Sequence, residues 1–256
     1  MQGRRNTQMD LHMICKIEKY NNNWVKREDL FSIAGVNGGK ARSCWNLMQG
    51  ARGVVTAGSR KSPQINIVAS IAKELGIPCH AHTPCGELGK ELLLAKSKGA
   101  NIIQHSPGYN PLLIRRARKH AEELGYLEIP FGMISNTTIE ETRKQVVGIP
   151  KGVKRIVISV GSGMSLAGLI WGLEDRGLGI PILGVVVGRN PIETLNQWAP
   201  FFWNRNVTLI PSGVDYHKEV HKTWNGIRLD PIYEAKCIPF LEDGDLFWII
   251  GVRESI

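Results

Sequence analysis

Residues 154–173 read KRIVISVGSGMSLAGLIWGL, an apolar run of strand type followed by a glycine-rich turn and a pattern of helix type. Glycines let backbone N–H groups approach an anion closely, and the amino end of a helix adds a partial positive charge. The stretch therefore predicts a strand, an anion-binding loop and a helix. We expect this loop to bind a phosphate group through Gly161, Ser162, Gly163, Met164 and Ser165.

A dinucleotide site is the competing interpretation of this loop. Its fingerprint requires a third glycine at position 166, where the chain has leucine, and an acidic residue after the next strand. The run 180–187 is followed instead by Gly188 and Arg189. A nicotinamide cofactor stays open as the weaker alternative, with Arg189 reaching a 2′-phosphate.

Outward from this stretch, short β-branched runs alternate with helical patterns from about residue 53 onward. Such alternation is typical of an α/β fold, in which mostly parallel sheets are covered by helices. The helical spacing is clear in Ile65, Val68, Ile71 and Leu75, which share one face. The expected strands are 53–57, 77–82, 100–104, 154–160, 180–187, 206–210 and 245–250.

A second motif places a lysine after a glycine turn, in VKREDLFSIAGVNGGKAR (25–42). Lys40 opens an apolar helical pattern, and partial desolvation near a helix N-terminus lowers the pKa of an amine toward that of a nucleophile. A phosphate-binding Walker A loop would need glycine at 34 and serine or threonine at 41, but both positions are alanine. Taken alone, the segment also fits a surface lysine after a flexible turn.

A third motif, TAGSRKSPQINIVASIAKELG, begins a helix with Ser62 as the N-cap and Pro63 in the first helical position. Capping alone explains the serine. The amides at such a helix start also suit a substrate carboxylate, to which Ser62 can donate as well.

The composition sets the broad class. The 256-residue chain has a net charge of +9 and no apolar run long enough to cross a bilayer, so no membrane association is expected. The N-terminus lacks the apolar core of a secretory signal, and five scattered cysteines suit reduced thiols, which makes the cytoplasm the default location. The charge favours a solvated cationic surface, with nucleic acid as a possible partner.

A metal site is not expected. Cys79, His80, His82 and Cys85 form a pattern typical of metal ligands, but strand alternation places the two histidines on one face. The sequence offers no further residues to complete a tetrahedral set.

Five motifs in order carry a resemblance to a known family. They are VKREDL (25–30), GGKAR (38–42), TAG (56–58) with Ser62, GSGMSLAGL (161–169) and GIRLDPIYEAK (226–236). Together they closely resemble the 1-aminocyclopropane-1-carboxylate deaminase and D-cysteine desulfhydrase family of the tryptophan-synthase-β superfamily. The resemblance covers nearly the whole chain.

This resemblance implies a fold-type-II pyridoxal-5′-phosphate enzyme, usually a homodimer, with two three-layer αβα lobes. It also implies a small domain inserted into a larger cofactor-binding domain. From the Gly/Pro-rich stretches at 106–111 and 129–136, we expect the small domain at 45–130 and the large one at 1–44 and 131–256. The resemblance also implies that Lys40 holds the cofactor as a Schiff base, that Ser62 is the catalytic serine that binds the substrate carboxylate, and that residues 161–165 hold the phosphate.

The chain departs from the family's pattern at three places. Pro63 and Gln64 replace the family's asparagine and histidine, so Gln64 is a substitute for the contact to the cofactor's phenolic oxygen. Ile250 replaces a threonine near the pyridine nitrogen. The tyrosine-rich stretch before the last helix is shortened, which leaves Tyr216 as the catalytic candidate there.

The function implied is a lyase or deaminase acting on the amino group of an amino acid. The cofactor supplies the electron sink, and the protein supplies orientation and proton transfer. One alternative is an enzyme that processes an amino-acid group attached to a modified pyrimidine in DNA, as in viral DNA hypermodification. A second alternative is a non-catalytic protein that retains the cofactor.

Overall fold

The computed structural model describes residues 14–106 and 110–254, which form two compact units. The first unit takes in residues up to 31 and 138–252, and the second takes in 32–137 and the residues from 253 onward. The sequence analysis expected the boundaries at 44/45 and 130/131, with Lys40 in the larger domain. In the structure, the segment with Lys40 falls in the second unit. The expected absence of a signal concerns residues 1–10, outside the described residues.

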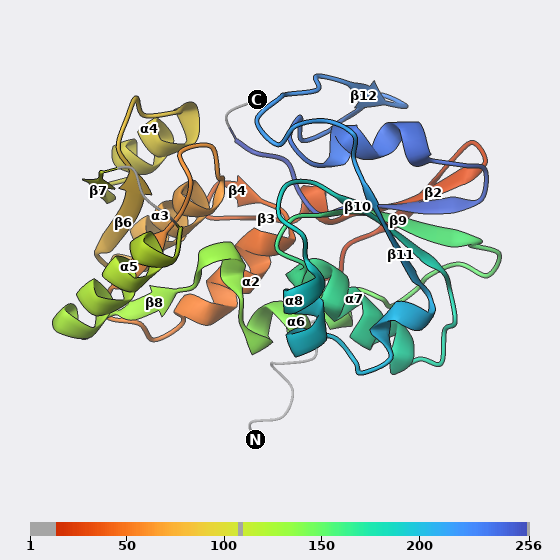
Figure 1. Ribbon diagram of the computed structural model, residues 1–256, viewed down its shortest axis with the longest axis horizontal. Coiled ribbons are helices and arrows are strands. Elements are labelled where there is room, and N and C mark those ends of the chain that lie inside the picture. The colour runs from red at the N-terminus through yellow and green to blue at the C-terminus, as the bar shows by residue number, and fades with distance from the viewer. Residues whose placement is uncertain (1–13, 107–109, 255–256) are drawn as a thin grey trace. The chain divides into compact units, whose positions relative to one another are not determined.

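The first unit contains a six-stranded sheet in the order β1-β2-β14-β9-β10-β11 (Figure 1). All neighbours are parallel except the β1–β2 hairpin. The strands are β1 (Ile17–Tyr20), β2 (Asn23–Arg27), β9 (Arg155–Val160), β10 (Ile182–Val186), β11 (Val207–Pro211) and β14 (Asp245–Ile249). The strands expected at 154–160, 180–187, 206–210 and 245–250 are therefore confirmed.

The sheet of the first unit is covered on both faces. Val157 points to a core that includes Phe247 and, from a 3-10 helix, Cys237. On the other face, α7 packs so closely on α6 that a Cβ on Gly172 would lie 2.6 Å from the carbonyl oxygen of Arg143. The covering elements are α6 (Asn136–Lys144), α7 (Met164–Glu174), α8 (Ile192–Trp198), η1 (Glu28–Leu30), η3 (Trp203–Arg205) and η4 (Glu234–Phe240), with a small hairpin of β12 (Thr223–Trp224) and β13 (Ile227–Arg228).

The second unit has a four-stranded parallel sheet in the order β7-β6-β5-β8. The chain crosses from β5 to β7 in one direction and then returns to β8 through α5. Right-handed crossovers therefore place α3 and α4 on one face and α5 on the other, where α5 packs on Val55 and Ala57. The elements are β3 (Ser32–Ile33), β4 (Val36–Asn37), α2 (Gly39–Met48), β5 (Val54–Ala57), α3 (Gln64–Leu75), β6 (Cys79–Pro84), α4 (Lys90–Ser97), β7 (Asn101–His105), α5 (Asn110–Leu124), β8 (Leu127–Ile129) and η2 (Phe131–Met133).

Both sheets have the parallel character expected of the α/β class, and each is covered by helices on its two faces. In such sheets, ligands bind beyond the carboxyl ends of the strands. The described residues include no helix long and apolar enough to span a bilayer. All five cysteines are free thiols.

Candidate functional site

The glycine loop follows the carboxyl end of β9, an interior strand of the first unit's sheet. β9 ends at Val160, and α7 begins at Met164 with Gly163 as its N-cap. Gly163 has a φ of 91°, and a Cβ there would lie 3.2 Å from the Cβ of Pro191. A Cβ on Gly161 would lie 3.0 Å from the ring of Tyr233. The strand, loop and helix are therefore as expected, and the geometry of the loop requires glycines where the sequence has them.

Two tyrosines lie at the same end of the sheet as the glycine loop. The sequence analysis predicted Tyr216 and missed Tyr233. Tyr216 lies beside the glycine that follows β10, because a Cβ on Gly188 would lie 3.2 Å from the Tyr216 ring. The Tyr216 hydroxyl is 3.5 Å from that of Tyr233, whose ring lies against Gly161. Tyr233 belongs to the motif at 226–236, which contained the signal for this residue.

The same motif supplies a buried acid, Glu234, at the start of η4. Its Oε1 accepts hydrogen bonds from the hydroxyl of Ser159 in β9, at 3.2 Å, and from the backbone N–H of Ile250 after β14, at 3.3 Å. Burial, reinforced by the charge of Asp230, raises the pKa of Glu234 to about 8. The edge of this sheet therefore carries a carboxyl group that can hold a proton near neutral pH. Sequence reasoning named Ile250 but missed Glu234.

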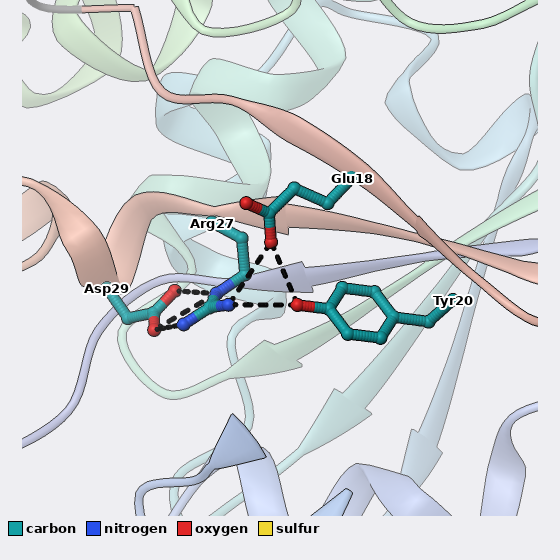
Figure 2. A network of polar contacts seen from close by, with 4 residues as sticks. All are labelled: Glu18, Tyr20, Arg27 and Asp29. Carbon is teal, nitrogen blue, oxygen red and sulfur yellow. Dashed lines mark hydrogen bonds and ion pairs between the residues drawn. The ribbon is translucent and has the colours of Figure 1, made fainter. Parts of the chain in front are cut away.

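The motif at 25–30 has a structural role in the first unit. The Arg27 guanidinium donates to both carboxylate oxygens of Asp29, and one of its nitrogens also donates to Glu18 at 3.3 Å. Tyr20 donates to the same Glu18 carboxylate at 3.0 Å, so Arg27 is enclosed by polar groups (Figure 2). The hydrogen bond to Asp29 is the main reason that the pKa of Arg27 is raised. This network fixes the β1–β2 hairpin to η1, which begins directly after β2.

In the second unit, Lys40 is the second residue of α2, as its position after the double glycine predicted. The β3–β4 hairpin leads into the helix through Gly38, whose φ of 99° favours glycine. The carbonyl oxygen of Gly38 accepts from the N–H groups of Ala41 and Arg42 at 3.0 and 3.3 Å. Lys40 is half-buried in the first turn of this helix.

Ser62 lies directly before Pro63, which is the N-cap of α3, one residue later than the sequence predicted. Its Oγ accepts a hydrogen bond of 3.3 Å from the backbone N–H of Gln64, and Pro63 between them has a helical φ of −70°. The carbonyl oxygen of Pro63 already accepts from Ile67 at 3.0 Å. Ser62 is half-buried and lies in the segment that leads from the carboxyl end of β5 to α3.

Gln64, the predicted contact to the cofactor's phenolic oxygen, is hydrogen-bonded within the second unit. Its Nε2 donates to the Thr56 hydroxyl at 3.1 Å and to the carbonyl oxygen of Pro130 at 2.9 Å. Its Oε1 accepts from the backbone N–H of Gly132 at 2.9 Å. Both amide hydrogens are thus engaged within the second unit, and only Oε1 keeps a lone pair for a further contact.

The histidines of β6 form a cluster that the sequence did not predict. His80 and His82 point to one face, as expected from strand alternation, and the ring of His80 packs edge-on against that of His120. The nitrogens of His82 lie 2.7 Å from Nε2 of His105 and 2.9 Å from Nδ1 of His120. Burial first, and then the neighbouring imidazoles, lower the pKa of His82 to about 4. In the part of the chain that the structure describes, no group of three His, Cys, Asp or Glu residues is arranged to hold a metal ion.

The chain is similar to curated D-cysteine desulfhydrases. Those of Salmonella newport and Salmonella heidelberg are each 24% identical to it over 275 residues, which is 86% of this chain and 80% of the relative. No protein-family model matches the chain. The resemblance seen in the five motifs is thus confirmed by sequence similarity along most of the chain.

Solved structures share the fold. An ACC deaminase homologue has a TM-score of 0.78 and 24% identity, and the match covers 94% of this chain and 90% of that one. A processed threonine deaminase from Solanum lycopersicum has a TM-score of 0.68 and 14% identity, with coverages of 99% and 86%. A pyridoxal 5′-phosphate-dependent aspartate racemase has a TM-score of 0.54 and 17% identity, with coverages of 90% and 68%. These likenesses confirm the expected fold of the tryptophan-synthase-β type.

Proposed function

We propose that this chain is a pyridoxal-5′-phosphate-dependent lyase or deaminase that acts on the amino group of an amino acid. The observation that carries the proposal is the narrow glycine loop at residues 161–165, which joins the carboxyl end of β9 to the start of α7. The relatives by sequence are desulfhydrases, and one neighbour by structure is named as dependent on this cofactor. Residues Lys40, Ser62 and Tyr216 are the proposed catalytic groups.

The loop fits the phosphate of the cofactor. A Cβ at Gly161 would crowd the ring of Tyr233 and one at Gly163 would crowd Pro191, so glycines let the loop take this tight path at the start of α7. The first amides of α7 have no partner inside the helix and can donate to phosphate oxygens. Ser162 and Ser165, both half-buried, add hydroxyl donors.

Lys40 supplies the amine. The bound cofactor would serve as the electron sink for the amino-acid substrate. Lys40 would hold the cofactor through its unprotonated amine, and that amine, once released, could take a proton from the substrate carbon. Lys40 lies in the first turn of α2, directly after the glycine turn.

The start of α3 is the proposed site for the substrate carboxylate. Ser62 holds the first turn by accepting from Gln64, and its own hydroxyl hydrogen stays available to donate. The positive end of the helix favours an anion in this position. Because Gln64 uses both amide hydrogens elsewhere, we propose that it contributes to cofactor binding through Oε1.

Addition of pyridoxal phosphate to the purified full chain tests the proposal. We expect a visible absorption band that Lys40→Ala abolishes and that Lys73→Ala, an exposed lysine on α3, retains. Amino acids, above all D-cysteine, should then change the band and release product. A protein that stays colourless with added cofactor would contradict the proposal, and a band without turnover of any amino substrate would support the non-catalytic alternative.

The net charge of +9 favours one second candidate, an amino-acid group linked to a modified pyrimidine in DNA. Binding of DNA that weakens steeply with salt supports it, because phosphate contacts release counterions. No binding at low salt eliminates it. We also propose that the protein is a homodimer, which sedimentation tests, and that it acts in the cytoplasm, where its five free thiols would stay reduced.

A further inference from the structure

The segment after β11 that carries Tyr216 has little backbone support of its own. β11 ends at Pro211, and none of the described residues from 212 to 222 belongs to a helix or strand. Backbone carbonyls in such a segment still need donors when they lie against the protein interior. Inside the segment, the backbone N–H of Lys218 donates to the carbonyl oxygen of Asp215 at 3.2 Å, and the Ser212 hydroxyl donates to that of Val214 at 3.0 Å. A further donor comes from another element of the first unit.

Lys236, in η4, supplies this further donor. Its side chain is among the largest fully buried ones, with 2% of the residue exposed. Its ammonium group donates to the carbonyl oxygen of Asp215 at 2.8 Å and lies 3.3 Å from that of Tyr216. A buried ammonium is costly unless hydrogen bonds replace its water, and these two carbonyls are part of that replacement.

The same short helix also contacts the loop and the end of β14. Tyr233, just before η4, lies against Gly161, and Glu234 accepts from Ser159 and Ile250. The backbone N–H of Lys236 donates to the carbonyl oxygen of Tyr233 at 3.1 Å. The position of Tyr216 is therefore tied, through Lys236, to the element that borders the glycine loop.

We propose that Lys236 is a positioning residue that fixes Tyr216 beside Gly188 and Tyr233 by binding the backbone carbonyls of Asp215 and Tyr216. The role of Tyr216 in catalysis rests on the proposed function. The link between Lys236 and Tyr216 is independent of that function. It explains how a shortened segment still presents a tyrosine at this edge. The charge and length of Lys236, and not only its bulk, are what the segment requires.

Hydrogen exchange on the full chain without cofactor tests the link directly. Lys236→Met should speed exchange of the amides at 213–218 by roughly tenfold, the effect of losing one net hydrogen bond. In Lys236→Met, the amides of β9 and β10 should keep their exchange rates. In the control Lys222→Met, which changes an exposed lysine, all amides should keep their exchange rates. Lys236→Arg should restore slow exchange. If Lys236→Met does not fold, Lys236→Gln replaces it, with the same expectation.

A spectroscopic arm tests the consequence for the proposed site. In the chain loaded with pyridoxal phosphate, Lys236→Met should shift the pH dependence of the visible band in the same direction as Tyr216→Phe. The double variant should add nothing further, and Lys236→Arg should behave as wild type. Unchanged exchange at 213–218, an equal increase over the whole chain, or additive spectral effects would overturn the inference. A chain that binds no cofactor refutes the proposed function alone, since the exchange result still decides the role of Lys236.

Discussion

The backbone N–H of Ile250 donates to Oε1 of Glu234, so the residue that replaces the family's threonine is bound to a buried acid. The side chain of Ile250 has no hydroxyl to offer at the end of β14. The polar group beside it is instead a carboxyl group from η4, whose burial and proximity to Asp230 favour its neutral form. This edge of the sheet therefore has a carboxyl group where the resemblance predicts a hydroxyl.

Glu234 should make the protein less stable as the pH rises. Its pKa is raised from 4.5 to about 8, so the folded chain binds a proton that the unfolded chain has already lost over this range. The stabilising contribution is complete below pH 4.5 and is lost as the pH approaches 8. In Glu234→Gln, the melting temperature should fall less than in wild type between these two values, as calorimetry can measure. An equal fall in both proteins would show that Glu234 is not the titrating group.

The histidine cluster should have the opposite pH dependence. The pKa of His82 is lowered from 6.5 to about 4, so the unfolded chain gains a proton first as the pH falls. The contribution of neutral His82 is present above pH 6.5 and is lost as the pH falls toward 4. We expect the contribution of His82 to the unfolding free energy to fall by roughly 1 to 3 kcal/mol over this range, so wild type should lose stability relative to His82→Asn as the pH falls. Urea unfolding at several pH values measures this difference, and identical acid profiles for the two proteins would refute it.

The fold could be predicted because its central strands are buried on both faces. β9 and β10 therefore appear in the sequence as continuous apolar runs, and the glycine loop follows one of them directly. β8, from Leu127 to Ile129, is too short to give a periodic signal. The two-residue strands β3 and β4 were missed for the same reason.

The site could be predicted only where neighbours in sequence determine it. Ser62 bonds to Gln64 two residues away, so the helix start was evident. Glu234 bonds to Ser159, which lies 75 residues away, and Gln64 bonds to Gly132, which lies 68 residues away. Such long-range partners depend on how the sheets assemble, which a single sequence does not reveal.

Gln64 should contribute to stability even without a cofactor. Its buried amide makes three hydrogen bonds that join α3 to β5 and to the residues after β8. Gln64→Ala would leave buried polar groups without partners, and we expect the unfolding free energy to fall by roughly 2 to 4 kcal/mol. The control is Gln49→Ala, where an exposed amide bonds to Trp45 alone. Similar small losses in both variants, measured by urea unfolding, would favour a role for Gln64 in cofactor binding only.

Gly163 should be required for cofactor binding more than for folding. Gly163→Ala introduces both a strained φ of 91° and a Cβ 3.2 Å from Pro191, which would displace the loop. Gly177→Ala, beyond the other end of α7, introduces a strained φ of 60° with no atom within 4 Å. We expect Gly177→Ala to cost about 1 kcal/mol of stability and leave the affinity for pyridoxal phosphate unchanged, because the αL penalty is local. Gly163→Ala should weaken that affinity by at least about tenfold, since the first amides of α7 would no longer converge on one phosphate. Titration of the visible band measures both affinities, and equal binding by the two variants would show that the phosphate is held elsewhere.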